Sequence, residues 1–200
     1  RAQNRPEICD LVPAYSSLLV CYDPRRASFA EIRTVLQNAM ESLQTYSPPE
    51  PRLIEIPTRY GSEFGPDLAF VARHNDITEN DVIRWHTSAI YRVYFVGFAP
   101  GFAYLGSIPA QITAPRMETP RTRVPAGSVG IAGRQTGIYP MDSPGGWRII
   151  GRTDLALFDP TCDPPARLRP GDRVRFVQMT EDERPTTDAA FRPPSSVTGH

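Results

Sequence analysis

The chain has 200 residues with 22 acidic and 22 basic side chains, so its formal net charge is +0 at pH 7. A neutral chain has no global field that would attract it to nucleic acid or to an anionic membrane, and we expect neither partner. All the basic residues are arginine, and the absence of lysine excludes Schiff-base catalysis, Lys-dependent phosphate capture and a covalently attached cofactor such as biotin on this chain.

Residues 1–90 are predicted to form a small α+β domain. Two stretches have the composition of strands, residues 15–22 (YSSLLVCY) and 51–60 (PRLIEIPTRY). Between them, the stretch SFAEIRTVLQNAMESL carries apolar residues at the helical period, and Ser28 with Glu31 has the spacing of a capping box. A helix is therefore expected between the two strands.

Two short helices are predicted to complete this domain, over residues 66–73 and 79–86. Thr78 and Asp81 occupy capping positions at the start of the second helix. A DNA-binding helix-turn-helix needs side chains that read bases and contact phosphates, whereas ENDVIRW offers acids and the single Arg84. The two helices are therefore interpreted as packing elements.

The pattern changes at Tyr91, where short β-rich runs separated by proline and glycine replace the helical period. The runs are YRVYFVGF, SVGIAG, GIYP, GWRIIGRT, ALFDP and DRVRFVQM. Residues 91–180 are therefore predicted to form an antiparallel β-barrel. Residues 181–200 lose apolar periodicity and are predicted to be a flexible tail.

The cysteines indicate a reducing compartment. Cys9, Cys21 and Cys162 are odd in number, widely spaced and without a C-x-x-C pattern. This argues against both a disulfide framework and a structural zinc site. We therefore expect a cytoplasmic location and no metal site on the chain.

Long proline- and glycine-anchored strings resemble one known family. YRVYFVGFAPGFAYLG, PRMETPRTRVPAGSVGIAGRQTGIYPMDSPGGWRIIGRT and LFDP, together with RYGSEFGPDLAFVARHNDITENDVIRWHTS, are similar to the family called allophanate hydrolase subunit 1, 5-oxoprolinase B subunit or KipI-like. The resemblance implies an α+β N-terminal domain followed by an all-β cyclophilin-like barrel, which agrees with the boundary expected near Ile90.

The resemblance also implies a role. The chain would be one subunit of an ATP-dependent 5-oxoprolinase complex that opens 5-oxoproline to glutamate, with ATP and magnesium in the assembled hydrolase. The implied partner is a homologous second barrel subunit, of the type called allophanate hydrolase subunit 2 or 5-oxoprolinase C subunit, and a LamB/YcsF-type protein is a further candidate subunit.

Two alternatives remain open. The chain could be half of a carboxyltransferase of the urea carboxylase or allophanate hydrolase type, with biotin brought on another chain. It could also be a non-enzymatic KipI-like inhibitor of a sensor histidine kinase.

A proline-stiffened loop is the first candidate ligand site. Arg116, Arg121 and Arg123 lie within PRMETPRTRVP. Arginines on a stiff loop can present planar forks to a carboxylate or phosphate. The alternative is structural pairing with acids such as Glu118 or Asp142, and both interpretations remain open.

Neighbouring polar groups could complete that site. In RQTGIYP, an amide, a hydroxyl and a phenol lie between glycines, which suits either a small polar ligand or hydrogen bonds within a turn. Arg152 is expected to make an inward charged contact, because an unpaired buried arginine is costly. The candidate substrate-binding residues are Arg116, Arg121, Arg123, Gln135, Thr136, Tyr139 and Arg152.

The glycine-rich run that begins at Gly127 lacks the signature of a phosphate loop. Neither a Walker-type lysine nor a G-x-G-x-x-G pattern is present, so the glycines are interpreted as strand corners whose amides could line a site. No catalytic residue is predicted. Ser128 lacks the helix that follows a nucleophile elbow, and His86, beside Trp85 at a helix end, is interpreted as a core or helix-terminal histidine.

Overall fold

The computed structural model describes residues 5–14, 16–42 and 50–180. The chain divides into two compact units, Arg1–Glu50 and Pro51–His200. The tail predicted over residues 181–200 lies outside the described residues.

The first unit contains a β-hairpin and one helix. Strands β1 (Ile8–Pro13) and β2 (Leu18–Tyr22) pair antiparallel, and α1 (Phe29–Ser42) follows them. The backbone N–H of Ser28 donates to Glu31 Oε2 at 2.7 Å, and the backbone N–H of Glu31 donates to Ser28 Oγ at 3.3 Å. These reciprocal bonds confirm the predicted capping box.

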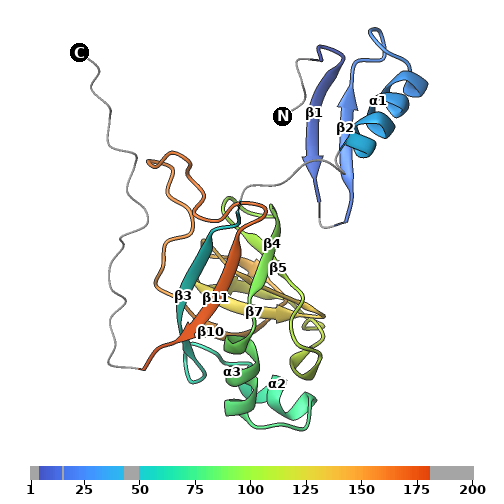
Figure 1. Cartoon of the computed structure of the whole chain (residues 1–200). Helices are drawn as coiled ribbons and strands as arrows, with labels where there is room; N and C mark the ends of the chain where they lie inside the picture. The colour runs from blue at the N-terminus through green and yellow to red at the C-terminus, as the bar shows by residue number, and fades with distance from the viewer. Residues whose placement is uncertain (1–4, 15, 43–49, 181–200) are drawn as a thin grey trace. The chain divides into compact units, whose positions relative to one another are not determined.

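The second unit is built around a closed barrel, with strand order β10-β3-β11-β4-β5-β8-β7 in the described part of the chain (Figure 1). Neighbouring strands pair antiparallel except β3 and β11, which run parallel. The barrel strands are β3 (Leu53–Tyr60), β4 (Tyr91–Val96), β5 (Ala103–Gly106), β7 (Ser128–Ala132), β8 (Gln135–Ile138), β10 (Arg148–Arg152) and β11 (Arg173–Gln178). A separate two-stranded sheet pairs β6 (Arg121–Val124) with β9 (Ser143–Gly145).

Two helices lie side by side at one end of the barrel, α2 (Leu68–His74) and α3 (Glu79–Ser88) (Figure 1). Thr78 and Asp81 form the predicted capping box of α3, because each side chain accepts a hydrogen bond from the other residue's backbone N–H. Among the described residues beyond Tyr91, the helical segment is a single 3₁₀ turn, η2 (Ala110–Ile112). No helix in the described ranges is long and apolar enough to span a bilayer.

The boundary expected near Ile90 is not where the chain divides. Strand β3 belongs to the barrel, between β10 and β11, and the α2–α3 pair packs on the same unit, so the division falls at Glu50. The local pattern grouped β3 with the helices next to it in sequence. Its partners in the sheet are β10 and β11, and Leu53 pairs with Arg173. Pairing between segments so far apart leaves no signal in local periodicity.

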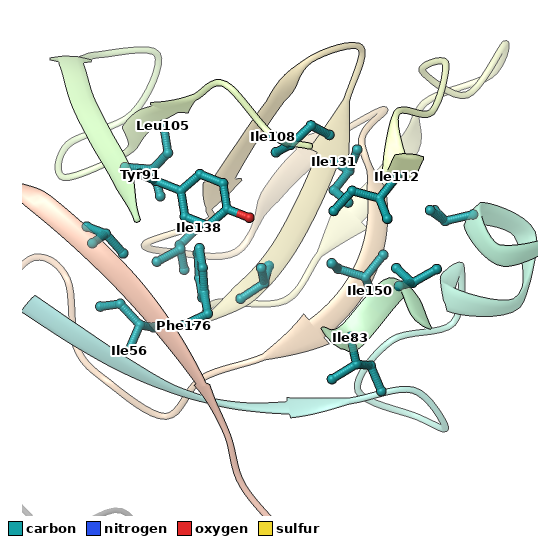
Figure 2. Packing of buried hydrophobic residues seen from close by; sticks show 14 of the residues in the cluster. Ile56, Ile83, Tyr91, Leu105, Ile108, Ile112, Ile131, Ile138, Ile150 and Phe176 are labelled. Atoms are coloured by element: carbon teal, nitrogen blue, oxygen red, sulfur yellow. The ribbon is translucent and has the colours of Figure 1, made fainter. Parts of the chain in front are cut away.

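The barrel interior is filled by aliphatic and aromatic side chains. Figure 2 shows Tyr91, Ile138 and Phe176 pointing toward one another inside the barrel, and all three are at most 1% exposed. Ile83 from α3 and Ile112 from η2 join the same cluster. The helical segments at this end of the barrel therefore contribute side chains to its core.

Candidate functional site

The outer face of β7 and β8 carries a second apolar cluster beside the barrel core. Side chains alternate along a strand, so Ile131 and Ile138 point inward while Ala132 and Tyr139 join the outer cluster. Trp147 is the largest member of that cluster and is 5% exposed.

The glycines of this face make room for Trp147. A Cβ built on Gly137 would lie 3.1 Å from Trp147 Cζ3 and 3.1 Å from Phe102 Cζ, and one on Gly130 would lie 3.1 Å from Trp147 Cβ. All three distances are tighter than ordinary carbon contacts. These two glycines are therefore architectural: they let an indole ring lie directly on the sheet.

The aromatic rings over this face pack edge to face. Phe102 meets Tyr139 at 5.3 Å between centroids and Trp147 at 5.6 Å, with interplanar angles of 81° and 89°. Tyr104 also meets the indole, at 6.0 Å. Phe98 reaches the edge of the cluster and is 65% exposed. The cluster is therefore a rigid, buried platform with an exposed aromatic rim.

Arg116 lies over this platform. Its Cζ is 5.9 Å from the centroid of Trp147, and the loop that carries it is held by a 2.8 Å hydrogen bond from the backbone N–H of Met117 to the carbonyl of Gly146. The side chain is exposed, and no acidic side chain in the described ranges forms an ion pair with it. Its guanidinium is therefore available to an anion.

The charge of Arg116 reaches two phenols. Burial raises the pKa of Tyr104 and of Tyr139, and the Arg116 guanidinium opposes that rise at both. Both phenols therefore stay protonated at neutral pH and can act as hydrogen-bond donors. Strand alternation places Gln135 on the same outer face as Tyr139. The structure thus brings Arg116, Gln135 and Tyr139 onto one face.

Arg121 is held by a buried acid. Its Nη2 donates to Asp67 Oδ1 at 2.9 Å, and Asp67 Oδ2 accepts the backbone N–H of Ile149 at 2.7 Å. Asp67 is 6% exposed. Of the two interpretations of this arginine, the structure therefore shows structural pairing, with an acid far away in the sequence.

Thr136 faces the barrel interior and does not join the outer face. Its Oγ1 lies 3.0 Å from His86 Nε2 and donates to the carbonyl of Gly130 at 3.0 Å. Because the Thr136 hydroxyl donates its proton to Gly130, it must accept a hydrogen bond from His86 Nε2–H. The neutral imidazole then carries its proton on Nε2, and His86 Nδ1 accepts from the Tyr60 hydroxyl at 2.7 Å. Burial lowers the pKa of His86 to about 3, and the histidine is therefore a neutral core residue, as the sequence indicated.

Arg123 and Arg152 form a second group around Asp142, further along β6 and β10. Arg123 Nη2 lies 2.6 Å from Asp142 Oδ2, and Asp142 Oδ1 accepts the backbone N–H of Ala126 at 2.8 Å. Arg152 has its Nε buried without a hydrogen-bond partner in the described part of the chain. The seven predicted residues are thus distributed over four places, and their role in binding a ligand stays a prediction.

Sequence reasoning missed Tyr104 and Asp67. Tyr104 lies between Ala103 and Leu105, two core residues that point inward, so period-two alternation could have placed its ring outside the barrel. No local sequence pattern identified Asp67 as a partner of Arg121, because its partners Arg121 and Ile149 are far away in the sequence.

Comparisons with known proteins identify the family. The model of the carboxyltransferase domain, subdomain C and D, matches residues 1–168. The chain is 46% identical over 181 residues to the 5-oxoprolinase B subunit of Escherichia coli O157:H7, covering 90% of this chain and 83% of the relative. It is 36% identical over 129 residues to urea amidolyase of Lachancea kluyveri, covering 58% of this chain and 7% of that protein.

A solved structure agrees with these matches. TTHA0988 superposes with a TM-score of 0.76 at 41% identity, covering 92% of this chain. The chain spans 35% of the length of TTHA0988, about a third. The fold, the sequence identity and the match to the carboxyltransferase domain, subdomain C and D, agree with one another. The chain belongs to the family of the 5-oxoprolinase B subunit.

Proposed function

We propose that the protein is one subunit of an ATP-dependent 5-oxoprolinase complex that opens 5-oxoproline to glutamate. The similarity to the 5-oxoprolinase B subunit over 90% of the chain supports this role, and the exposed Arg116 over Trp147 is the observation in the structure that carries it. The complex contains a homologous second barrel subunit, of the 5-oxoprolinase C type, with a LamB/YcsF-type protein as a further subunit. Only the assembled complex is active.

The outer face matches the chemistry of 5-oxoproline. This substrate has one carboxylate and one lactam amide. The Arg116 guanidinium takes the carboxylate through a planar fork. The Gln135 amide and the Tyr104 hydroxyl supply neutral hydrogen-bonding groups for the lactam N–H and carbonyl. Trp147 and Phe102 give the ring an apolar floor.

The remaining predicted residues support this site. Arg121, fixed by Asp67, anchors strand β6 beside Met117, to whose sulfur its Nη1 also donates. Tyr139 is part of the platform itself, where its ring packs against Phe102. Thr136 fixes β8 from inside the barrel through His86. These contacts hold the outer-face groups in place, and the residues act as positioning residues.

Catalysis requires groups beyond this chain. Phosphorylation of the lactam oxygen by ATP would activate the ring carbon toward water, and the charge developing in that step needs electrostatic stabilisation. The described residues include no cluster of three or more His, Cys, Asp or Glu that could hold a metal ion. We therefore place the magnesium with the nucleotide and the partner subunits, and assign substrate orientation to this chain.

The test is reconstitution. The chain, co-expressed with the two partner subunits, should release glutamate from 5-oxoproline in an ATP-dependent manner. Arg116→Met should lower kcat/KM by about 10- to 100-fold, equivalent to loss of a charged hydrogen bond of about 1.5–3 kcal/mol. Arg173→Met is the matched control, because Arg173 is an exposed arginine on β11. An unchanged kcat/KM for Arg116→Met in an assembled complex would show that the substrate binds elsewhere.

The carboxyltransferase match favours one second candidate. Because the family model is described as a carboxyltransferase domain, the chain could transfer a carboxyl group as half of a urea carboxylase-like enzyme. A chain without lysine carries no biotin itself, so another chain would bring it. Biotin-dependent carboxylation by the chain with a biotin carboxylase, and no glutamate release from 5-oxoproline, would select this function.

A further inference from the structure

Arg152 is a partly buried cation that forms no ion pair with an acid of the described ranges. It ends strand β10, with Ser128 of β7 and Arg59 of β3 beside it in the strand register. A Cβ built on Gly127 would lie 3.4 Å from Arg152 Cγ, so the stem packs on backbone. The guanidinium faces the ring of Phe64, 5.8 Å from its centroid. Its Nε is buried and has no acceptor in the described part of the chain.

The acids around Arg152 are already bound to other groups. Asp154 pairs with Arg59. Asp142 accepts the Ala126 N–H through one oxygen and Arg123 through the other. These contacts, the Ala126 N–H first and the Arg123 side chain second, lower the pKa of Asp142, and the more distant charge of Arg152 adds to them. Asp142 is therefore ionised and lies within electrostatic range of Arg152 without a direct bond to it.

The charges of this cluster do not balance. Three guanidinium groups, those of Arg59, Arg123 and Arg152, share two carboxylates, Asp142 and Asp154. A cation placed in a partly apolar setting without a counter-ion is unfavourable, and an orphaned guanidinium N–H adds to the cost. An oxyanion with several acceptor oxygens would supply the missing negative charge, because it can accept from more than one guanidinium at once.

We propose that Arg152 binds a phosphate group together with Arg59, its neighbour in the strand register, and Arg123, which pairs with Asp142. A phosphate carries about two negative charges at neutral pH, against one for a carboxylate, and its oxygens accept from planar guanidinium forks. The group can come from free phosphate or from a nucleotide. The inference deepens the proposed function, since it assigns the phosphate to a place separate from the Arg116 face that takes the carboxylate.

The experiment measures binding of inorganic phosphate to the full chain by isothermal titration calorimetry at low salt and pH 7.5. Wild-type protein should bind phosphate at least tenfold more tightly than acetate. Arg152→Met should weaken phosphate binding at least tenfold, and Arg173→Met should change it less than twofold. Arg173 pairs with Leu53 at the far end of β3 from Arg59, about 20 Å away at 3.3 Å per residue.

A second variant separates binding from folding. Asp142→Asn keeps an amide oxygen for the Ala126 N–H but frees Arg123 from its ion pair, so phosphate should bind about threefold or more tightly. Loss of a merely structural charge cluster would not tighten binding. Phosphate binding that is absent in the wild type, unchanged in Arg152→Met or unchanged in Asp142→Asn would overturn the proposal.

The source of the phosphate follows from a third titration. If ATP binds more than tenfold tighter than phosphate and loses affinity with Arg152→Met, a nucleotide is the ligand. If ATP and phosphate bind alike with the same dependence on Arg152, free phosphate is the ligand. Both measurements use this chain without its partners, so a failure here is distinct from a failure of glutamate release in the complex.

Discussion

The stability of the folded protein should fall between pH 7.5 and pH 5 because of His86. Burial lowers the pKa of its imidazole from 6.5 to about 3, since the ring is 0% exposed and a charged ring would lose its hydration. In the unfolded chain the ring has its ordinary pKa and takes up a proton as the pH falls. The unfolded state then binds more protons, so stability present above pH 6.5 is lost progressively toward pH 3.

The size of this loss follows from linkage. At pH 5 the unfolded state gains RT ln(1 + 10^1.5), about 2 kcal/mol, relative to a pH well above 6.5. Any folded-state pKa below about 4.5 changes this value by only about 0.2 kcal/mol, because the folded ring stays neutral at pH 5 in every such case. The prediction therefore depends on the burial of His86 and hardly on its folded-state pKa.

Urea unfolding followed by circular dichroism at the two pH values measures the effect. His86→Gln removes the titrating group, and the amide can still donate to Thr136 and accept from Tyr60. The stability difference between pH 7.5 and pH 5 should be about 2 kcal/mol smaller in the variant than in the wild type. His74 is present in both proteins, so its contribution cancels when the two stability differences are compared. An equal loss in both proteins would refute the neutral, buried state of His86.

Two stability predictions concern the outer face. Asp67→Ala should lower the free energy of unfolding, measured by chemical denaturation, by about 3 kcal/mol. The substitution leaves the Arg121 guanidinium without its acid and the Ile149 N–H without its acceptor. Gly137→Ala should lower the free energy of unfolding by about 1–3 kcal/mol, because the new methyl group would lie 3.1 Å from Trp147. Gly146→Ala is the control and should lower it clearly less in the same assay, because its Cβ would lie 3.5 Å from the nearest atom.

Local features of the fold were predictable from the sequence. Both capping boxes form as their spacing indicated, and helix α1 follows from its period. The barrel strands from β4 onward lie in the β-rich region that begins at Tyr91. These features depend on residues within a few positions of each other, which is why a single sequence reveals them.

The closure of the barrel and the grouping of site residues were not predictable in this way. Arg116, Gln135 and Tyr139 share a face only because β8 pairs with β7 and Trp147 folds back over both. Thr136 was predicted as a ligand-binding residue, yet it points inward because it follows Gln135 by one position on a strand with both faces covered. Where both faces of a strand are buried, composition does not say which side chain faces the site.

The parallel pairing of β3 with β11 has a consequence for synthesis of the protein. Leu53 pairs with Arg173, and Glu55 bonds Arg175 across 120 residues of chain. At about 5–20 residues per second, the ribosome needs about 6–24 s to make β11 after β3. During that interval β3 has an unpaired edge and an apolar face, so the nascent chain is open to wrong strand pairing until β11 has been made.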